Sequence, residues 1–137
     1  MQWLQRTYAE VCPEQQEFRH LAATLAQYWS GGQGLTWITQ STTRVACLWQ
    51  AMAVDQITGD RYPHVLLLRV VPDHRRRGLA RTLMATVQTQ AQQQGYGQVG
   101  LQVASHNSAA LAFYHALGYQ TRSLLLMKSL PNSANCD

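Results

Sequence analysis

Three consecutive arginines and a glycine are the residues of this sequence best suited to chemistry. Arg75, Arg76 and Arg77 stand before Gly78, after an apolar run at residues 64–71 and before a run with helical apolar periodicity. A helix N-terminus exposes unpaired backbone N–H groups and the positive end of its dipole, and arginine binds phosphate in a bidentate fork. Glycine has no Cβ, so the backbone can approach an anion closely. The arrangement predicts a pyrophosphate site; the alternative is a solvated charge cluster.

A second segment, residues 107–119, places an asparagine and a tyrosine at one short predicted helix. Asn107 stands where a helix N-cap is expected. Tyr114 shares a helix face with Phe113 and Leu117. Spacing alone favours a packed aromatic side chain for Tyr114 over a catalyst.

Length and charge limit the classes of protein to consider. The 137 residues predict a single domain, residues 1–137, with a sizeable core. Lys+Arg is 11 and Asp+Glu is 7, which gives a net charge of +4. Arg75, Arg76, Arg77 and Arg81 concentrate this charge in one place, which favours one anionic ligand over a nucleic acid as partner.

The cysteines and apolar runs indicate a compartment. Cys12, Cys47 and Cys136 are an odd number without a close pair, which predicts a reducing environment, the cytoplasm. No Cys/His spacing is typical of a metal site. No apolar run is long enough for a signal peptide or a membrane span, so we expect no membrane partner.

The elements that position these residues alternate between helices and strands. We expect helices at residues 3–11, 13–29, 79–94 and 107–117, and strands at 35–39, 45–54, 64–71, 99–104 and 120–130. Residues 30–34 are predicted to be a loop, and the tail over 131–137 is expected to fray. The run at residues 95–100 reads G-x-G-x-x-G, but it follows a helix, so it is predicted to be a helix cap and turn.

Together the two segments resemble the GNAT superfamily of acyl-CoA-dependent N-acyltransferases. The R-x-x-G-x-A pattern at residues 75–80 is similar to the family's CoA pyrophosphate motif. The N-x-x-A-x-x-F-Y-x-x-x-G-Y pattern at residues 107–119 is similar to its second CoA motif. The resemblance, over about residues 35–130, implies an α/β fold with a mixed, mainly antiparallel central sheet flanked by helices. It also implies transfer of an acetyl group from acetyl-CoA to a primary amine, a small amine or a protein N-terminus, by direct attack in a ternary complex.

The resemblance also implies roles for individual residues, with the cofactor in the splay between strands 64–71 and 99–104. Tyr114 would protonate the leaving thiolate. Asn107 would contact the pantetheine arm. The arm would pair with the backbone of Leu68, Arg69 and Val70. The pyrophosphate would be held by Arg75, Arg76, Arg77, Gly78, Leu79, Ala80 and Arg81.

Two departures from the family pattern leave alternatives open. Residues 1–10 are short for both the strand and the first helix of the family, so we expect either that this strand is missing or that the sequence begins late; a missing edge strand favours a homodimer. Gln102 stands where the branch that acetylates ribosomal proteins carries a glutamate base, which leaves His64, Asp55 or His106 acting through water. The alternatives are a non-catalytic, regulatory CoA-binding module and, more distantly, a nucleic-acid binder that uses Arg75–Arg77.

Overall fold

The computed structural model describes residues 2–3 and 34–131. The chain forms two compact units, Met1–Gln102 and Val103–Asp137. The helices predicted at 3–11 and 13–29, the loop before Gly34, the missing first strand and the tail beyond Pro131 fall outside the described residues, except that residues 2–3 are helical.

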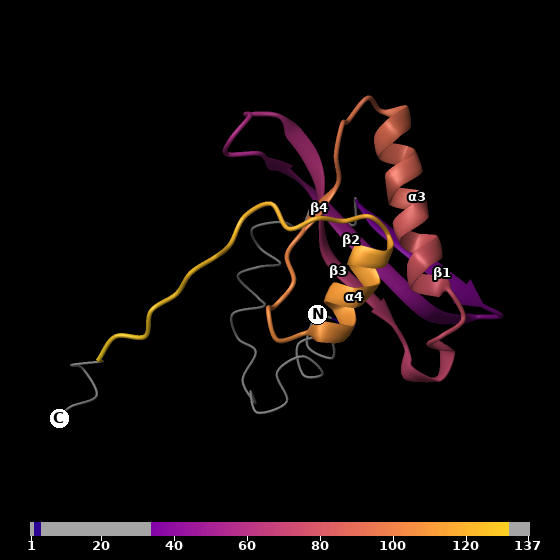
Figure 1. Cartoon of the computed structure of the whole chain (residues 1–137). Coiled ribbons are helices and arrows are strands. Elements are labelled where there is room, and N and C mark those ends of the chain that lie inside the picture. The colour runs from indigo at the N-terminus through magenta and orange to yellow at the C-terminus, as the bar shows by residue number, and fades with distance from the viewer. Residues whose placement is uncertain (1, 4–33, 132–137) are drawn as a thin grey trace. The chain divides into compact units, whose positions relative to one another are not determined.

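A four-stranded sheet forms the centre of the first unit (Figure 1). Its strands, in spatial order, are β1 (Leu35–Gln40), β2 (Thr43–Val54), β3 (Arg61–Val70) and β4 (Gly100–Leu101). The β1–β2 and β2–β3 pairs are antiparallel, and the β3–β4 pair is parallel. The predicted mixed, mainly antiparallel sheet is confirmed, although the strand expected at 99–104 is only two residues long.

Apolar side chains pack against both this sheet and the helix that follows β3. Cys47, Trp49 and Leu67 form a buried cluster against which Trp3 and Trp37 pack. The helix α3 (Leu79–Gln93) contacts β2 and β3 and buries the side chains of Leu83, Met84, Val87 and Ala91. The helix predicted at residues 79–94 and its apolar periodicity are therefore confirmed. Each large buried side chain contributes roughly 1.5–3 kcal/mol.

A β-bulge interrupts β3 in its middle. The β2–β3 register passes from Trp49↔Leu67 to Gln50↔Val65, so Leu66 is an extra residue on β3. A bulge bends its strand and increases the local twist. The parallel pairing with β4 stops next to the bulge, at Val65↔Leu101. Beyond that point β3 has no strand on its β4 side among the described residues.

A short connection leads from β3 into α3, and a tight turn ends that helix. The 3-10 helix η1 (Pro72–His74) follows β3, and Gly78 is the N-cap of α3. At the other end Gly95 has a φ of +86°, and the Tyr96 N–H donates to the Ala91 carbonyl at 2.9 Å. This geometry is a Schellman cap. The prediction that the G-x-G-x-x-G run caps a helix is confirmed.

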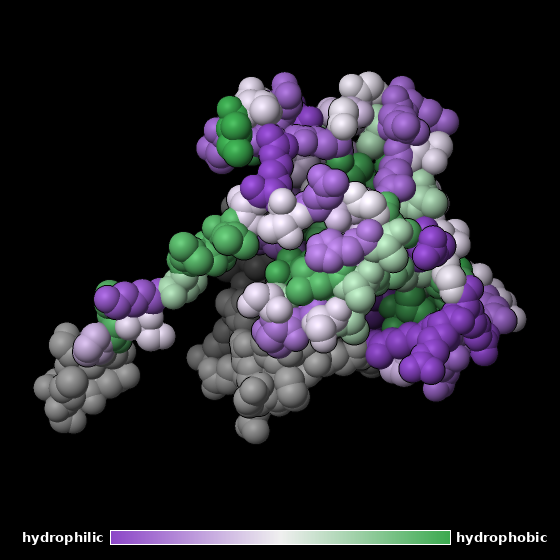
Figure 2. All heavy atoms as spheres, viewed as in Figure 1, coloured by the Kyte–Doolittle hydropathy of each residue, from purple (hydrophilic) through white to green (hydrophobic). Residues whose placement is uncertain are grey.

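The second unit contains one described helix, α4 (Ser108–Ala116), and the segment that follows it. No helix or strand is present over residues 119–131, so the strand predicted at 120–130 is wrong. Strand-forming residues become a strand only where another backbone pairs with them, and none of the described residues does so here. The exposed apolar side chains of this segment, visible as green spheres in Figure 2, are those of Leu124, Leu125, Leu126, Met127 and Leu130. Among the described residues no helix combines the length and apolarity that crossing a membrane requires.

Candidate functional site

The turn between β3 and α3 has two residues in the left-handed region. Arg76 has a φ of +64° and Gly78 a φ of +78°. A side-chain-bearing residue adopts this conformation at a cost, and such strained positions are concentrated at ligand-binding loops. Left-handed residues within a turn direct successive backbone N–H groups toward one concave side, which suits an anion.

The first turn of α3 adds to this anion site. Gly78 is the N-cap without a side-chain cap hydrogen bond, and the first turn contains no acidic residue. A Cβ built on Gly78 would meet nothing within 4 Å, so the space in front of the helix end is open. The helix dipole and unpaired N–H groups favour negative charge here. The residues present therefore fit a phosphate-bearing group.

The four arginines of this region differ in what they do. The Arg75 Nε–H donates to the Val70 carbonyl at 2.9 Å, which ties the turn to the end of β3. Arg76, Arg77 and Arg81 are exposed, and their guanidinium groups have no hydrogen-bond or ion-pair partner among the described residues. Arg75 thus shapes the turn, whereas the other three leave their charge available to a ligand.

Past Val65 the edge of β3 on its β4 side is open, because no described strand pairs with it there. Along the predicted segment Leu68, Arg69 and Val70, the backbone groups of every second residue point to this open edge. The Val71 N–H donates to the Val45 carbonyl on β2 at 2.9 Å. Since backbone groups alternate along a strand, those of Leu68 and Val70 point away from β2. Arg69 faces β2, and its buried guanidinium lies 5.8 Å from the Trp3 ring centroid. An extended ligand added at this edge would meet the N–H and C=O of Leu68 first.

Sequence reasoning missed the feature that creates this edge. The bulge at Leu66 coincides with the end of the β3–β4 pairing. The segment from Val65 to Leu68 is a continuous apolar run, which contains no glycine or proline to signal a bulge. The bulge is apparent only from the pairing of β3 with β2, and the residues of β3 by themselves do not indicate that pairing.

Asn107 and Tyr114 lie on the second unit. The Asn107 side chain accepts a hydrogen bond from the Ala110 N–H at 3.2 Å, which confirms the predicted N-cap. Tyr114 makes edge-to-face contacts with Phe113 and Tyr119, with ring centroids 5.0 and 5.7 Å away. Burial, and secondarily Tyr119, raise the pKa of Tyr114 to about 12. The phenol is therefore a neutral O–H donor at physiological pH.

Asp55 is held by hydrogen bonds and is not poised as a base. Its Oδ1 accepts from the Ile57 N–H at 2.9 Å, and its Oδ2 accepts from Gln98 Nε2 at 3.0 Å. The side chain thus joins the β2–β3 turn to the loop before β4. His106 is exposed on the second unit.

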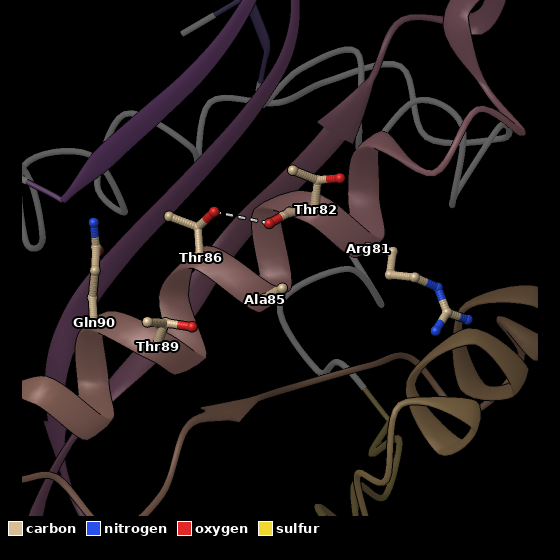
Figure 3. Close-up of a pocket in the computed structure, with 6 residues that line it drawn as sticks. All are labelled: Arg81, Thr82, Ala85, Thr86, Thr89 and Gln90. Atoms are coloured by element: carbon tan, nitrogen blue, oxygen red, sulfur yellow. Dashed lines mark hydrogen bonds between the residues drawn. The ribbon is translucent and has the colours of Figure 1, made fainter.

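A shallow hollow of about 450 Å³ lies along one face of α3. Figure 3 shows the side chains that line it, with the Thr86 hydroxyl bonded to the Thr82 carbonyl: Arg81, Thr82, Ala85, Thr86, Thr89 and Gln90. None of these carries a carboxylate, imidazole or thiol, so the hollow has no catalytic group. Within residues 2–3 and 34–131, no three His, Cys, Asp or Glu side chains gather as a metal site requires.

Comparison with known proteins identifies the family. Residues 1–119 match the profile of the acetyltransferase (GNAT) family. The chain belongs to this family. GNAT acetyltransferases use acetyl-CoA, which agrees with the arginine-rich turn and the open strand edge described above.

Curated relatives and solved structures give the extent of the similarity. The chain is 32% identical over 85 residues to human N-acetyltransferase 8, covering 61% of this chain and 37% of that protein. It spans less than half the length of the curated relatives it matches.

Two solved structures share the GNAT fold. A putative acetyl transferase from Pyrococcus furiosus superimposes with a TM-score of 0.75 at 18% identity, over 93% of this chain and 89% of that one. An aminoglycoside N-acetyltransferase in complex with CoA gives a TM-score of 0.63 at 17% identity, over 83% and 88% of the two chains.

Proposed function

We propose that this GNAT chain transfers an acetyl group from acetyl-CoA to a primary amine by direct attack in a ternary complex. The observation that carries the proposal is the continuity between the β3 edge at Leu68 and the arginine-lined turn before α3. CoA joins a pyrophosphate to the pantetheine arm, which contains amide groups. The turn suits the pyrophosphate and the open edge of β3 suits the arm, and turn and edge follow each other in the order in which CoA connects its two parts.

The binding roles divide between backbone and charge. The turn and the first residues of α3, Gly78, Leu79 and Ala80, offer backbone N–H groups to the pyrophosphate. Arg76, Arg77 and Arg81 add charge-assisted hydrogen bonds of roughly 1.5–3 kcal/mol each. Arg75 orients the turn through its hydrogen bond to the Val70 carbonyl, and the buried Arg69 lies against the Trp3 ring. We assign the pantetheine arm to Leu68 and Val70, with Asn107 as a further contact.

Tyr114 is proposed as the acid that completes the reaction. Acetyl-CoA supplies the activated thioester. The amine nitrogen forms a bond to the carbonyl carbon, the carbon–sulfur bond breaks, and the thiolate takes the Tyr114 proton. The attacking amine loses its own proton to a base. The Tyr114 phenol, whose pKa burial raises to about 12, is protonated at neutral pH and so has a proton to donate.

We also propose a cellular compartment and an oligomeric state for this protein. Cys47 is a free, buried thiol whose pKa is raised to about 11 by burial, which fits a reducing compartment such as the cytoplasm. The exposed apolar residues Leu124–Met127 favour a homodimer. The acceptor class, a small amine or a protein N-terminus, is left to experiment.

A second candidate function is a CoA-binding regulatory module without catalysis. The observation that favours it is the absence of any carboxylate from β3 and β4, both fully described, with Gln102 directly after β4. Such a module would bind CoA and turn over no amine.

One assay separates the two functions. Free-thiol release from acetyl-CoA is followed across a panel of polyamines, aminoglycosides, amino acids and N-terminal peptides, and CoA affinity is measured by calorimetry. We expect thiol release with one class of acceptor. CoA binding without release from any amine would instead support the regulatory module, and no CoA binding at all would refute both.

A further inference from the structure

His64 occupies the position on β3 toward which the proposed CoA arm runs. It pairs with Gly100 on β4 and with Ala51 on β2. The bulge at Leu66 and the open edge at Leu68 follow it along the strand. A strand rises about 3.3 Å per residue, so His64 lies roughly 13 Å beyond Leu68, away from the phosphate-binding turn. An arm that begins at the turn and follows the edge therefore carries its thioester toward His64.

The imidazole of His64 has a nitrogen that the described fold leaves unused. Its Nδ1 is buried and has no hydrogen-bond partner among the described residues. Buried polar atoms without a partner cost free energy and are rare in native structures. A substrate proton or a water molecule supplied by the bound acceptor would give this nitrogen the partner it lacks.

The neighbours of His64 leave it uncharged and hold it in place. The Tyr62 ring lies edge-to-face, with centroids 6.0 Å apart. A Cβ on Gly100 would come to 2.5 Å from Tyr62 Cε2, so any larger residue there would require the Tyr62 ring to shift. Tyr62 is the titratable group beside His64, whereas Ala51 and Gly100, its partners on β2 and β4, are uncharged. Burial lowers the pKa of His64, so a lone pair is available to accept a proton at neutral pH.

We propose that His64 is the general base of the acetyl transfer, taking the proton from the amine as its nitrogen bonds to the thioester carbonyl. This inference rests on the proposed function. The carbon–sulfur bond breaks in the same reaction, Tyr114 protonates the sulfur, and both side chains return to their starting states by exchange with solvent. Among the three candidates predicted for this role, Asp55 has both carboxylate oxygens engaged.

The test compares His64→Gln with His64→Glu, and with His115→Gln as a matched control. His115 is exposed near the end of α4 and has no assigned role. With an acceptor found in the thiol-release screen, His64→Gln is expected to lower kcat by about 10²–10³. CoA affinity by calorimetry should stay within threefold, and the acidic limb of the pH profile of kcat/KM should disappear. His64→Glu, which restores a base, should recover at least tenfold of the lost kcat.

The outcomes distinguish this inference from the function it rests on. Wild-type activity together with unchanged kcat and an unchanged acidic limb in His64→Gln would overturn the base and leave the acetyltransferase standing. A loss in His64→Gln that His64→Glu does not reverse, accompanied by lower CoA affinity or melting temperature, would make His64 structural. CoA binding by wild-type protein without any thiol release would remove the function and the base together.

Discussion

At the scale of single residues, environment rather than residue type sets what each candidate can do. Tyr114 and His64 are both neutral at physiological pH, and burial reinforces that state by raising the pKa of Tyr114 to about 12 and lowering the pKa of His64. One is therefore an acid with a proton to give and the other a base with a lone pair. Asp55, the one carboxylate among the three bases predicted from the sequence, has a structural role through its hydrogen bonds to Ile57 and Gln98.

Replacing Tyr114 by phenylalanine removes the acid and keeps the ring. We expect kcat to fall by about 10²–10⁴ while CoA affinity is unchanged. Because the Tyr114 pKa is about 12, the phenol stays protonated from pH 7 to 9, so the loss should be equal at both pH values. The measurements are steady-state thiol release and calorimetry, with Tyr96→Phe, in the turn after α3, as control. Full activity in Tyr114→Phe would eliminate the acid role.

At the scale of elements, the site arises where three local structures meet. The bulge at Leu66 ends the β3–β4 pairing, the turn before α3 curls in the left-handed region, and the N-terminus of α3 lacks any capping side chain. Each leaves backbone groups unsatisfied, and all three lie along one stretch of chain. A ligand that combines phosphates with amides satisfies them together.

The turn can be tested with Gly78→Asp against Gly59→Asp. Both glycines have a φ near +79° and open space where a Cβ would lie, so both variants bear the same backbone strain. In Gly78→Asp the carboxylate also repels phosphate at the end of α3. We expect CoA affinity to fall at least about 100-fold in Gly78→Asp, the size of one or two lost charge-assisted hydrogen bonds. Calorimetry should find Gly59→Asp close to wild type; an equal loss in both would mean that strain alone is responsible.

The β3–β4 contact can be tested with Gly100→Ala against Gly97→Ala. The added Cβ at Gly100 meets the Tyr62 ring at 2.5 Å, whereas at Gly97 it meets nothing within 4 Å. We expect Gly100→Ala to lower the free energy of unfolding by about 1–3 kcal/mol, and Gly97→Ala by less than about 0.5 kcal/mol. Denaturant titration measures both. Tyr62→Ala should then lower the free energy of unfolding less in the Gly100→Ala background than in the wild type. Equal losses in the two backgrounds would exclude the clash.

At the scale of the whole molecule, one apolar segment, residues 124–130, is exposed among the described residues. Leu125 is 79% exposed and Met127 is 86% exposed, within a run of apolar residues that no described strand pairs with. Exposed runs of strand-forming residues favour association between chains.

The proposed homodimer can be tested with Leu125→Lys combined with Met127→Lys. The added charges oppose apolar association, so we expect a dimeric wild type to become monomeric. Light scattering coupled to gel filtration measures the mass. Ile57→Lys, which replaces an apolar residue that is 75% exposed in the β2–β3 turn, should leave the dimer intact. A monomeric wild type would refute the dimer, and a dimer in every variant would place the contact elsewhere.

Local signals in the sequence predicted much of the fold. The periodicity of Leu83 and Val87 identified α3, Gly95 identified its end, and Asn107 identified the start of α4, since each depends on residues close along the chain. The family motifs could be recognised in the sequence for the same reason, because a turn and a helix N-terminus are built from consecutive residues. The site roles drawn from those motifs stay predictions.

The tertiary structure decided what depends on pairing between distant segments. The strand expected at 120–130 does not form, and the β4 strand shrinks to Gly100–Leu101, because strands need a partner backbone. Three features have no local signature: the bulge at Leu66, the hydrogen bond from Gln98 to Asp55, and the buried Nδ1 of His64, which no described residue pairs with. Residue types and spacing thus identified the family by themselves and predicted a phosphate-binding role for the turn before α3. Register and burial, which arise only when the strands come together, decided where the sheet opens and which side chains are available to act there.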